Sequence, residues 1–482
     1  MERNNVLLKI TDLRQYFPVG KKKGETVGLV GESGCGKSTF GRTLLQLYRQ
    51  TDGKTMYYGA SRDELAPEYI EKTIRHLPHG LHELAALEKK RDEMQKVYDA
   101  AAAKKAANDA YLNIVNVIGG FITAKDLGPV MKIFSERHDR CCDLHKAIEK
   151  RAPVKLNYDE EAFKLSKLKA GERGYDSRKG KLDKLAEKVA AHDKLVEAAR
   201  AEIAKVDARI DAMRAKYAAD PEFQKHEALL DNGIDLARLT YPEVRTLRCQ
   251  MQYIFQDPYS SLNPRMTVAN IIGEGLLAHK YCKKANERMH EEILQTMEDC
   301  GLAPYFLHRY PHQFSGGQRQ RIGIARSLAV HPKFVVCDEA VSALDVSIQS
   351  QIINLLQDLK EQQHLTYLFI THDLSVVKYI SDRIGVMYLG NLVELADSQE
   401  IFDHPMHPYT EALLESIPTT EEKRDLAVLE GDIPSPVNPP KGCKFHTRCK
   451  YCTEICTHVV PDWEEVTPNH FVACHHKLHT NE

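Results

Sequence analysis

The chain has 482 residues, of which 43% are hydrophobic, and its 66 lysines and arginines nearly balance its 68 aspartates and glutamates. This length predicts two to four domains with a sizeable core. The near-neutral charge excludes the strong positive field that nucleic-acid binders usually carry. The longest uncharged apolar stretch, residues 113–122, is far shorter than a membrane-spanning helix, and no signal-peptide pattern opens the chain. We therefore expect a cytoplasmic protein whose twelve cysteines are reduced or metal-bound.

The residue composition and the spacing of apolar residues change three times along the chain, which predicts four segments. Residues 1–60 alternate short apolar runs with glycine-rich turns, and residues 231–418 return to this α/β pattern. Between them, residues 61–230 are rich in charge and alanine, which predicts an inserted α-helical region. Residues 419–482 are rich in proline, cysteine and histidine, so we expect a small C-terminal domain that something other than an apolar core holds together.

A glycine-rich loop follows a predicted apolar strand. Gly31-Glu32-Ser33-Gly34-Cys35-Gly36-Lys37-Ser38 fits the phosphate-loop pattern G-x-x-x-x-G-K-[ST], and a helix is predicted over residues 39–48. Such a loop turns its N–H groups toward phosphate oxygens, its lysine bridges the β- and γ-phosphates, and its serine ligates Mg²⁺. The alternative is a glycine-rich turn with a chance Lys-Ser pair. The predicted nucleotide contacts are Gly31, Ser33, Gly34, Cys35, Gly36, Lys37, Ser38 and Thr39.

A second half of a nucleotide site is predicted where a buried strand over residues 334–337 ends in two carboxylates. Asp338 is placed to hold Mg²⁺ together with Ser38, and Glu339 is placed to polarise an attacking water. The alternative is an ordinary strand followed by an acidic turn. Cys337 is expected to be an inert buried thiol.

The turn Ser315-Gly316-Gly317-Gln318 opens a predicted helix shortly before this strand. Gln256, the turn Ser342-Ala343-Leu344-Asp345 and His372 complete an ordered set of motifs. With this set the chain resembles the ATP-binding cassette (ABC) family. The resemblance implies an α/β P-loop cassette with a RecA-like core, an antiparallel β edge and a helical subdomain.

The resemblance also implies how ATP and Mg²⁺ are used. Two cassettes pair head to tail around ATP, so that the turn from Ser315 to Gln318 in one cassette caps the γ-phosphate held by the other. Glu339 would act as the base or water-positioning group, and His372 would contact the γ-phosphate. Gln256 would join Mg²⁺ and the water to a membrane partner, and Asp345 would also contribute to the nucleotide site.

Four stretches resemble one branch of the family, the ATPase subunits of bacterial oligopeptide and dipeptide importers, and in particular the F-type subunit. They are residues 255–266, 312–321, 407–414 and 431–436. The resemblance implies a heterodimer with a D-type ATPase on the cytoplasmic face of the inner membrane. It also implies two permease subunits and, indirectly, an external peptide-binding protein. No residue selects the cargo, so import of nickel, opines or glycopeptides is an alternative.

Two departures from the family pattern bear on the predicted site. The extra strand that usually precedes the phosphate loop is missing, because only residues 18–25 separate Tyr16-Phe17 from the strand that begins at Thr26. Tyr16 is the candidate for stacking on adenine, and the shortened segment puts the ATP affinity in question. Ala340 stands where the family usually has proline, which should have a small effect.

ATPases of chromosome maintenance and DNA repair form the alternative class, since they also carry coiled coils inside a cassette. In those proteins the coil separates the glutamine-loop half from the signature half. Here Gln256 and Ser315 are close in sequence and the insertion precedes both. Translation-associated cassette proteins carry two cassettes, whereas this chain has one phosphate loop. We therefore expect no nucleic-acid partner.

The C-terminal segment carries cysteines that are spaced as possible metal ligands. Cys443-x5-Cys449-x6-Cys456-x17-Cys474 could hold a [4Fe-4S] cluster or a tetrahedral Zn²⁺, or the thiols could be unliganded. The resemblance to the importer family favours the iron–sulfur cluster. Cys452, His475 and His476 lie nearby and leave the ligand set open.

The inserted region contains an apolar seam whose members alternate spacings of three and four, typical of a coiled coil. An earlier arm, with apolar residues from Leu84 to Ala101, is expected to pack antiparallel against it, with residues 114–130 near the tip of the hairpin. The alternatives for the hairpin are a solvated decoration, a docking arm for another protein, and a surface that binds nucleic acid or a membrane. The seam consists of Leu182, Leu185, Val189, His192, Val196, Ala199, Ile203, Val206, Ile210, Met213 and Tyr217.

Overall fold

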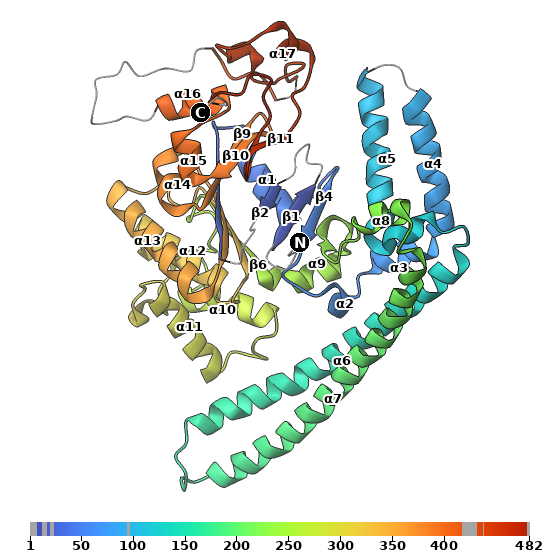
Figure 1. Cartoon of the computed structure of the whole chain (residues 1–482). Coiled ribbons are helices and arrows are strands. Elements are labelled where there is room, and N and C mark those ends of the chain that lie inside the picture. Colours follow the sequence, from blue (N-terminus) through green and yellow to red (C-terminus); the bar gives the residue numbers. More distant parts are fainter. Residues whose placement is uncertain are drawn as a thin grey trace. The chain divides into compact units, whose positions relative to one another are not determined.

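The computed structural model describes residues 7–11, 17–19, 24–93, 97–416, 431–436 and 438–479. The chain forms two compact units (Figure 1). The first unit combines residues 1–59 with residues 245–482, and the second consists of residues 60–244.

The first unit is built on an eight-stranded mixed sheet with the strand order β11-β12-β10-β9-β3-β8-β7-β6. The strands from β9 to β6 run parallel, and the other three are added antiparallel at the β9 edge. The central strands β3, β7 and β8 are buried along their whole length, as expected for strands covered on both faces. The predicted mixed α/β sheet is thus confirmed. The strands are β3 (Thr26–Val30), β6 (Met251–Ile254), β7 (Phe334–Asp338), β8 (Thr366–Ile370), β9 (Arg383–Tyr388), β10 (Asn391–Asp397), β11 (Glu464–Thr467) and β12 (His470–Val472).

A small antiparallel arrangement of β1 (Leu8–Thr11), β2 (Phe17–Val19) and β4 (Lys54–Tyr57) accompanies the main sheet in the first unit. Helices α10 to α13 and strands β6 to β8 contribute to one apolar core, whose side chains include Ile272, Met297 and Ile322. The helices are α1 (Lys37–Leu44), α9 (Tyr241–Leu247, which crosses the unit boundary), α10 (Val268–Ala278), α11 (Glu287–Asp299), α12 (Gly316–Leu328), α13 (Val346–Gln363), α14 (Leu374–Ile380), α15 (Ser398–Asp403), α16 (Pro408–Glu415) and α17 (Glu454–His458), with 3-10 turns η5 (Arg248–Gln250), η6 (Pro304–Phe306), η7 (Pro311–Gln313) and η8 (His446–Arg448).

The second unit is almost entirely helical. Two helix pairs dominate it: α4 packs along α5, and the longer α6 packs along α7 (Figure 1). A compact core of aromatic and branched side chains, centred on the fully buried Phe121, lies where these helices meet. The elements are α2 (Arg62–Leu65), α3 (Glu68–Arg75), α4 (Leu77–Glu93), α5 (Val97–Ile118), η2 (Gly119–Thr123), α6 (Gly128–Ser166), α7 (Tyr175–Arg214), η3 (Ala215–Tyr217), α8 (Pro221–Glu227), β5 (Ile234–Asp235) and η4 (Leu236–Arg238).

The apolar seam predicted for residues 182–217 lies on the inward face of α7. Val196, Ile203, Val206 and Ile210 are buried, and the other members of the seam are partly buried. The expected pairing was wrong, because α7 packs along α6 while the earlier arm in α4 packs along α5. The placement of residues 114–130 near the tip was also wrong. Ile114, Phe121 and Val130 share a core with Val206 and Ile210, at the end of α7 opposite the turn that joins it to α6.

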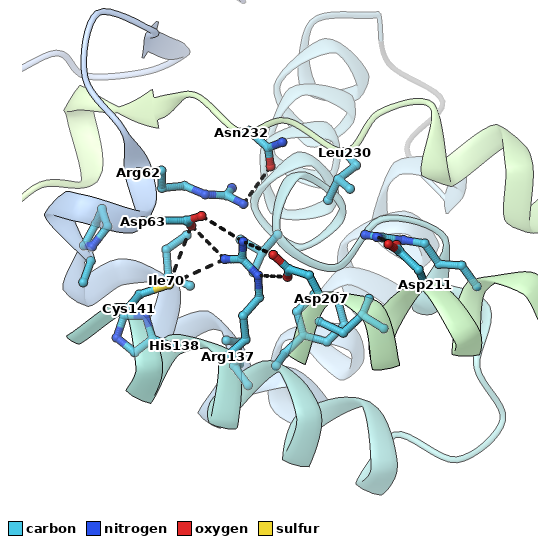
Figure 2. Close-up of a pocket in the computed structure, with 17 residues that line it drawn as sticks. Arg62, Asp63, Ile70, Arg137, His138, Cys141, Asp207, Asp211, Leu230 and Asn232 are labelled. Atoms are coloured by element: carbon cyan, nitrogen blue, oxygen red, sulfur yellow. Dashed lines mark hydrogen bonds and ion pairs between the residues drawn. The ribbon is translucent and has the colours of Figure 1, made fainter. Parts of the chain in front are cut away.

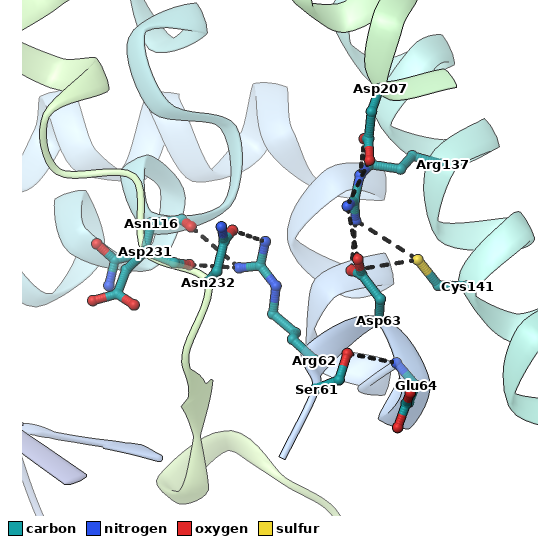
Figure 3. Close-up of polar contacts among 10 residues, drawn as sticks. All are labelled: Ser61, Arg62, Asp63, Glu64, Asn116, Arg137, Cys141, Asp207, Asp231 and Asn232. Atoms are coloured by element: carbon teal, nitrogen blue, oxygen red, sulfur yellow. Dashed lines mark hydrogen bonds and ion pairs between the residues drawn. The ribbon is translucent and has the colours of Figure 1, made fainter. Parts of the chain in front are cut away.

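A polar cavity of about 250 Å³ lies in the second unit, between α2, α6 and α7 (Figure 2). Arg137 of α6 crosses it and joins two carboxylates (Figure 3). Its guanidinium donates to both oxygens of Asp63, at 2.8 and 2.9 Å, and to Asp207 of α7 at 2.6 Å. These carboxylates help to raise the pKa of Arg137, against the opposing effect of burial. Because each charged group has a partner of opposite charge, we interpret the network as a structural ion-pair network that links α2, α6 and α7.

Candidate nucleotide-binding site

The phosphate loop joins β3 to α1 in the first unit. A Cβ atom at Gly31 would lie 2.2 Å from the carbonyl oxygen of Met387, so this position accepts only glycine. Gly36 caps α1 with a φ of 101°, a left-handed conformation that glycine adopts without strain. The ammonium of the buried Lys37 donates to the carbonyl oxygens of Gly31 at 2.6 Å and Glu32 at 3.1 Å. The lysine is therefore folded into the loop. Ser33 and Thr39 are exposed, and Cys35 is buried.

The magnesium ligands predicted from the sequence come together at the end of β7. The Ser38 hydroxyl donates to the Asp338 carboxylate at 2.6 Å. Asp338 is fully buried and accepts a second hydrogen bond, also 2.6 Å, from the hydroxyl of Tyr253 on β6. Burial and the Asp338 charge raise the pKa of Tyr253, so it remains a donor. A hydroxyl beside a carboxylate is a donor set that suits Mg²⁺, which binds oxygen ligands.

The three residues predicted to be catalytic form one cluster at the edge of the parallel strands. The Gln256 amide donates to one oxygen of the Glu339 carboxylate at 2.6 Å, and Nδ1 of His372 lies 3.3 Å from the other. Glu339 has a φ of 44°, a left-handed conformation that is uncommon for residues other than glycine and often marks functional sites. Its N–H donates to the carbonyl oxygen of Ile370 at 2.8 Å, which ties this unusual turn to the end of β8.

The signature turn begins α12 and closes on itself. The Ser315 hydroxyl accepts from the Gln318 N–H at 3.4 Å, and the Gln318 side chain accepts from the Ser315 N–H at 3.2 Å, which is a capping box. Gly316 and Gly317 occupy the first helical turn, where N–H groups have no partner within the helix. Ser315 and Gly316 are exposed. The turn thus offers backbone donors at a helix N-terminus, a suitable site for an anion.

Asp345 follows the signature helix in the chain and caps α13. Its carboxylate accepts from the Ile348 N–H at 3.0 Å and from the Ser347 hydroxyl at 2.7 Å. These hydrogen bonds lower the pKa of Asp345. In the single chain, therefore, Ser315, Gln318 and Asp345 hydrogen-bond within their own turns.

Comparisons with known proteins agree with this arrangement. A family model described as ABC transporter matches residues 19–138 and 218–342, and one described as the C-terminal region of oligopeptide/dipeptide transporters matches residues 393–456. The chain is 52% identical over 253 residues to the oligopeptide transport ATP-binding protein AppF of Bacillus subtilis (strain 168), a match that covers 51% of this chain and 76% of AppF. It is 47% identical over 246 residues to the oligopeptide transport ATP-binding protein OppF of Haemophilus influenzae, covering 50% of this chain and 74% of OppF.

The chain belongs to the ABC transporter family. It is an ATP-binding protein of the oligopeptide/dipeptide type, and ABC proteins of this kind are ATPases. A putative peptide import ATP-binding protein of Brucella ovis is also similar, with 51% identity over 248 residues, 51% of this chain and 78% of that protein. The comparisons do not favour the alternative of a DNA-maintenance ATPase. No helix in the described residues of this ABC ATPase is long and apolar enough to cross a membrane.

The predicted adenine contact of the ABC site precedes the phosphate loop. Tyr16, the candidate for stacking on adenine, lies outside the described residues. The strand β2 ends at Val19 and β3 begins at Thr26. The role of Tyr16 therefore stays a prediction.

Several cysteines of the C-terminal segment interact electrostatically. Burial raises the pKa of Cys474 to about 12, and Cys443, Cys449 and Cys456 add to this increase. Burial and the neighbouring cysteines likewise raise the pKa of Cys449 to about 11. Among the described residues, however, no group of three or more Cys, His, Asp or Glu side chains is placed to hold a metal ion. These thiols influence one another but do not form a metal-binding geometry, so the iron–sulfur cluster and its zinc alternative stay predictions.

Two tyrosines and one arginine support the nucleotide site without having been predicted to do so. The Tyr253 hydroxyl donates to Asp338, and the place of Tyr253 on a buried strand close to Gln256 was the only sequence signal. The Glu32 N–H of the phosphate loop donates to the hydroxyl of Tyr409 at 2.9 Å. The Glu32 carboxylate is bound by Arg448 of the C-terminal segment. Neither Tyr409 nor Arg448 belongs to the phosphate-loop motif.

Proposed function

We propose that this ABC ATPase powers the import of oligopeptides or dipeptides. The cluster of Gln256, Glu339 and His372 beside the phosphate loop carries the hydrolytic part of the proposal. The peptide part is supported by the matched C-terminal region and by relatives named as oligopeptide transport and peptide import ATP-binding proteins. Nickel, opine and glycopeptide import are the competing cargo classes.

In the proposed reaction the phosphate loop and Lys37 bind the triphosphate. Ser38 and Asp338 would hold Mg²⁺, and the ion would supply positive charge to the phosphate oxygens. Lys37 must exchange its present carbonyl partners for phosphate oxygens. Glu339 orients the attacking water, and Gln256 and His372, which already contact its carboxylate, keep that carboxylate in place.

The proposed site is completed by a second cassette. The signature turn, Ser315 to Gln318, has exposed residues and an N-terminal helical turn that can face an anion, and the side chains of Ser315 and Gln318 hydrogen-bond to each other's N–H groups. We assign it to the γ-phosphate of a partner ATPase, with Asp345 nearby in the interface. The proposed partner is a D-type sister subunit, and the pair would bind two permease subunits at the cytoplasmic face of the membrane.

The experiment that tests this function is reconstitution of the ATPase with its D-type partner, permease subunits and peptide-binding protein in proteoliposomes. We expect ATP-dependent accumulation of a labelled oligopeptide inside vesicles in which the ATPase subunits and the ATP are on the inner side. ATP hydrolysis that is stimulated by nickel or a glycopeptide, and never by peptides, would assign the complex to another cargo class. A wild-type chain that does not bind ATP would refute the cassette function itself.

We also propose that the C-terminal cysteines hold a [4Fe-4S] cluster with a structural role. This proposal is supported by the effect of Cys443, Cys449 and Cys456, which help burial to raise the pKa of Cys474, since such an effect requires the sulfur atoms to be near one another. Anaerobically purified protein should then contain iron and acid-labile sulfide in near-equal amounts, and Cys456→Ser should lower both. Stoichiometric zinc without sulfide would favour the alternative metal, and a Cys249→Ser variant provides the control.

A further inference from the structure

The phosphate loop is in direct contact with the C-terminal cysteine-rich segment, although the two are more than 400 residues apart in the chain. The Arg448 guanidinium, at the end of η8, donates to both oxygens of the Glu32 carboxylate, at 2.7 and 3.1 Å. The Arg448 side chain is only 4% exposed and Glu32 only 20%. A buried bidentate pair of this kind fixes the position of both groups, because the planar fork allows one relative orientation.

A second residue from outside the phosphate loop holds the backbone of Glu32. Its N–H donates to Tyr409 at 2.9 Å. The Tyr409 ring packs against Tyr388 and Phe445, with ring centroids 4.7 and 5.2 Å apart. Phe445 immediately precedes η8, so the apolar contact and the ion pair anchor the same part of the C-terminal segment. The backbone N–H and the carboxylate of Glu32 are therefore both restrained by residues from outside the nucleotide motifs.

The charge of Glu32 makes this restraint relevant to ATP. Its carbonyl oxygen accepts from the Lys37 ammonium at 3.1 Å, so Glu32 is part of the loop that would surround the phosphates. An unpaired carboxylate at this position would repel the triphosphate. Arg448 neutralises that charge and binds the carboxylate to the C-terminal segment.

We infer that Arg448 is a positioning residue of the nucleotide site, which holds and neutralises Glu32 so that the phosphate loop can accept ATP. The inference rests on the proposed function, because it assumes that the loop binds ATP. It makes the C-terminal segment a functional part of the cassette. Loss of this contact should weaken ATP binding without changing the catalytic cluster.

The test compares five full-length variants with the wild type by calorimetric titration with Mg²⁺–ATP. Arg448→Gln should bind ATP about tenfold more weakly, since it leaves the Glu32 carboxylate without its partner. Adding Glu32→Gln to this variant should return the affinity to that of Glu32→Gln alone, because no charge is left to neutralise. Arg448→Lys, which keeps the charge but loses the fork, should fall between wild type and Arg448→Gln. Lys450→Gln is the control, because Lys450 is an exposed cation of the same segment that pairs with Glu411 and Glu415 instead.

Two results would overturn the inference. One is an unchanged ATP affinity in both Arg448 variants. The other is a double variant that binds ATP as weakly as Arg448→Gln, which would show that the arginine only stabilises the segment. In the assembled transporter, a positioning role should raise KM for ATP in Arg448→Lys and leave kcat near the wild-type value. If wild-type protein fails to bind ATP, the proposed function fails instead.

Discussion

Glu339 combines an unusual backbone with two polar partners at the proposed site of water attack. Its carboxylate contacts Gln256 and His372, while Lys37, Ser38 and Asp338 make their contacts without it. Glu339→Gln should therefore lower ATP turnover by at least about a hundredfold, because it removes the carboxylate that orients the water. ATP affinity should be retained. Phosphate release and nucleotide titration of the same preparation measure the two effects.

The control for this prediction is Glu361→Gln, at an exposed position near the end of α13. It should hydrolyse ATP like the wild type. Loss of nucleotide binding in Glu339→Gln, or turnover close to that of the control, would contradict the role assigned to Glu339.

At the scale of single residues, the sequence predicted those members of the site that stand at fixed spacings within motifs. Glu339 and His372 are examples, and their side chains are in contact in the structure. The sequence did not reveal the roles of Tyr253 or Arg448. Tyr253 meets Asp338 across 85 residues, and Arg448 meets Glu32 across 416. Such pairs depend on strand order and on the docking of the C-terminal segment, which a single sequence does not contain.

At the scale of elements, α16 begins at a buried histidine that must stay neutral. Nδ1 of His407 accepts from the Tyr409 N–H at 3.0 Å, and the His407 N–H donates to the buried Glu394 at 3.0 Å. Burial, opposed by the Glu394 charge, lowers the pKa of His407 to about 4, against 6.5 for an ordinary histidine. The unfolded chain therefore takes up a proton at a higher pH than the folded chain.

This difference predicts a loss of stability as the pH falls. The contribution of neutral His407 is fully present above pH 6.5 and decreases toward pH 4, by up to about 3 kcal/mol. His407→Asn keeps a cap for α16 but does not titrate, so its unfolding midpoint should fall less between pH 7 and pH 5. The one tryptophan, Trp463, precedes β11 and stacks on Phe471 of the neighbouring strand, which makes its fluorescence a local probe of denaturation. Parallel pH profiles for the variant and wild type would contradict the prediction.

The pairing of the long helices in the second unit could not be predicted from the sequence. The spacing of three and four correctly indicated the buried face of α7, because that spacing follows from helix geometry. It could not identify the helix that covers this face. The partner, α6, continues through Pro153, a residue that usually ends or kinks a helix. Its contact with α7 also relies on polar groups such as Arg137, which an apolar pattern does not detect.

At the scale of the whole molecule, all the described nucleotide-site residues belong to the first unit. The ends of this unit on either side of the second unit also come close together. The Tyr57 hydroxyl donates to the Gln250 side chain at 2.9 Å, and the Lys333 ammonium donates to the carbonyl oxygen of Gly59. The first unit is thus closed by its own contacts at the point where the chain leaves it.

Replacing residues 60–244 with a short glycine-serine linker should therefore leave ATP binding and hydrolysis within a few fold of the wild type. The excision removes the complete second unit, so that the core around Phe121 and the Arg137 network leave no exposed remnant. Nucleotide titration and phosphate release with the partner ATPase present measure the outcome, and peptide uptake in proteoliposomes measures any separate role in transport. Normal hydrolysis with impaired uptake would make the second unit a docking arm. A shortened protein that folds, as judged by circular dichroism, but does not hydrolyse ATP would show that the inserted helices belong to the catalytic machinery.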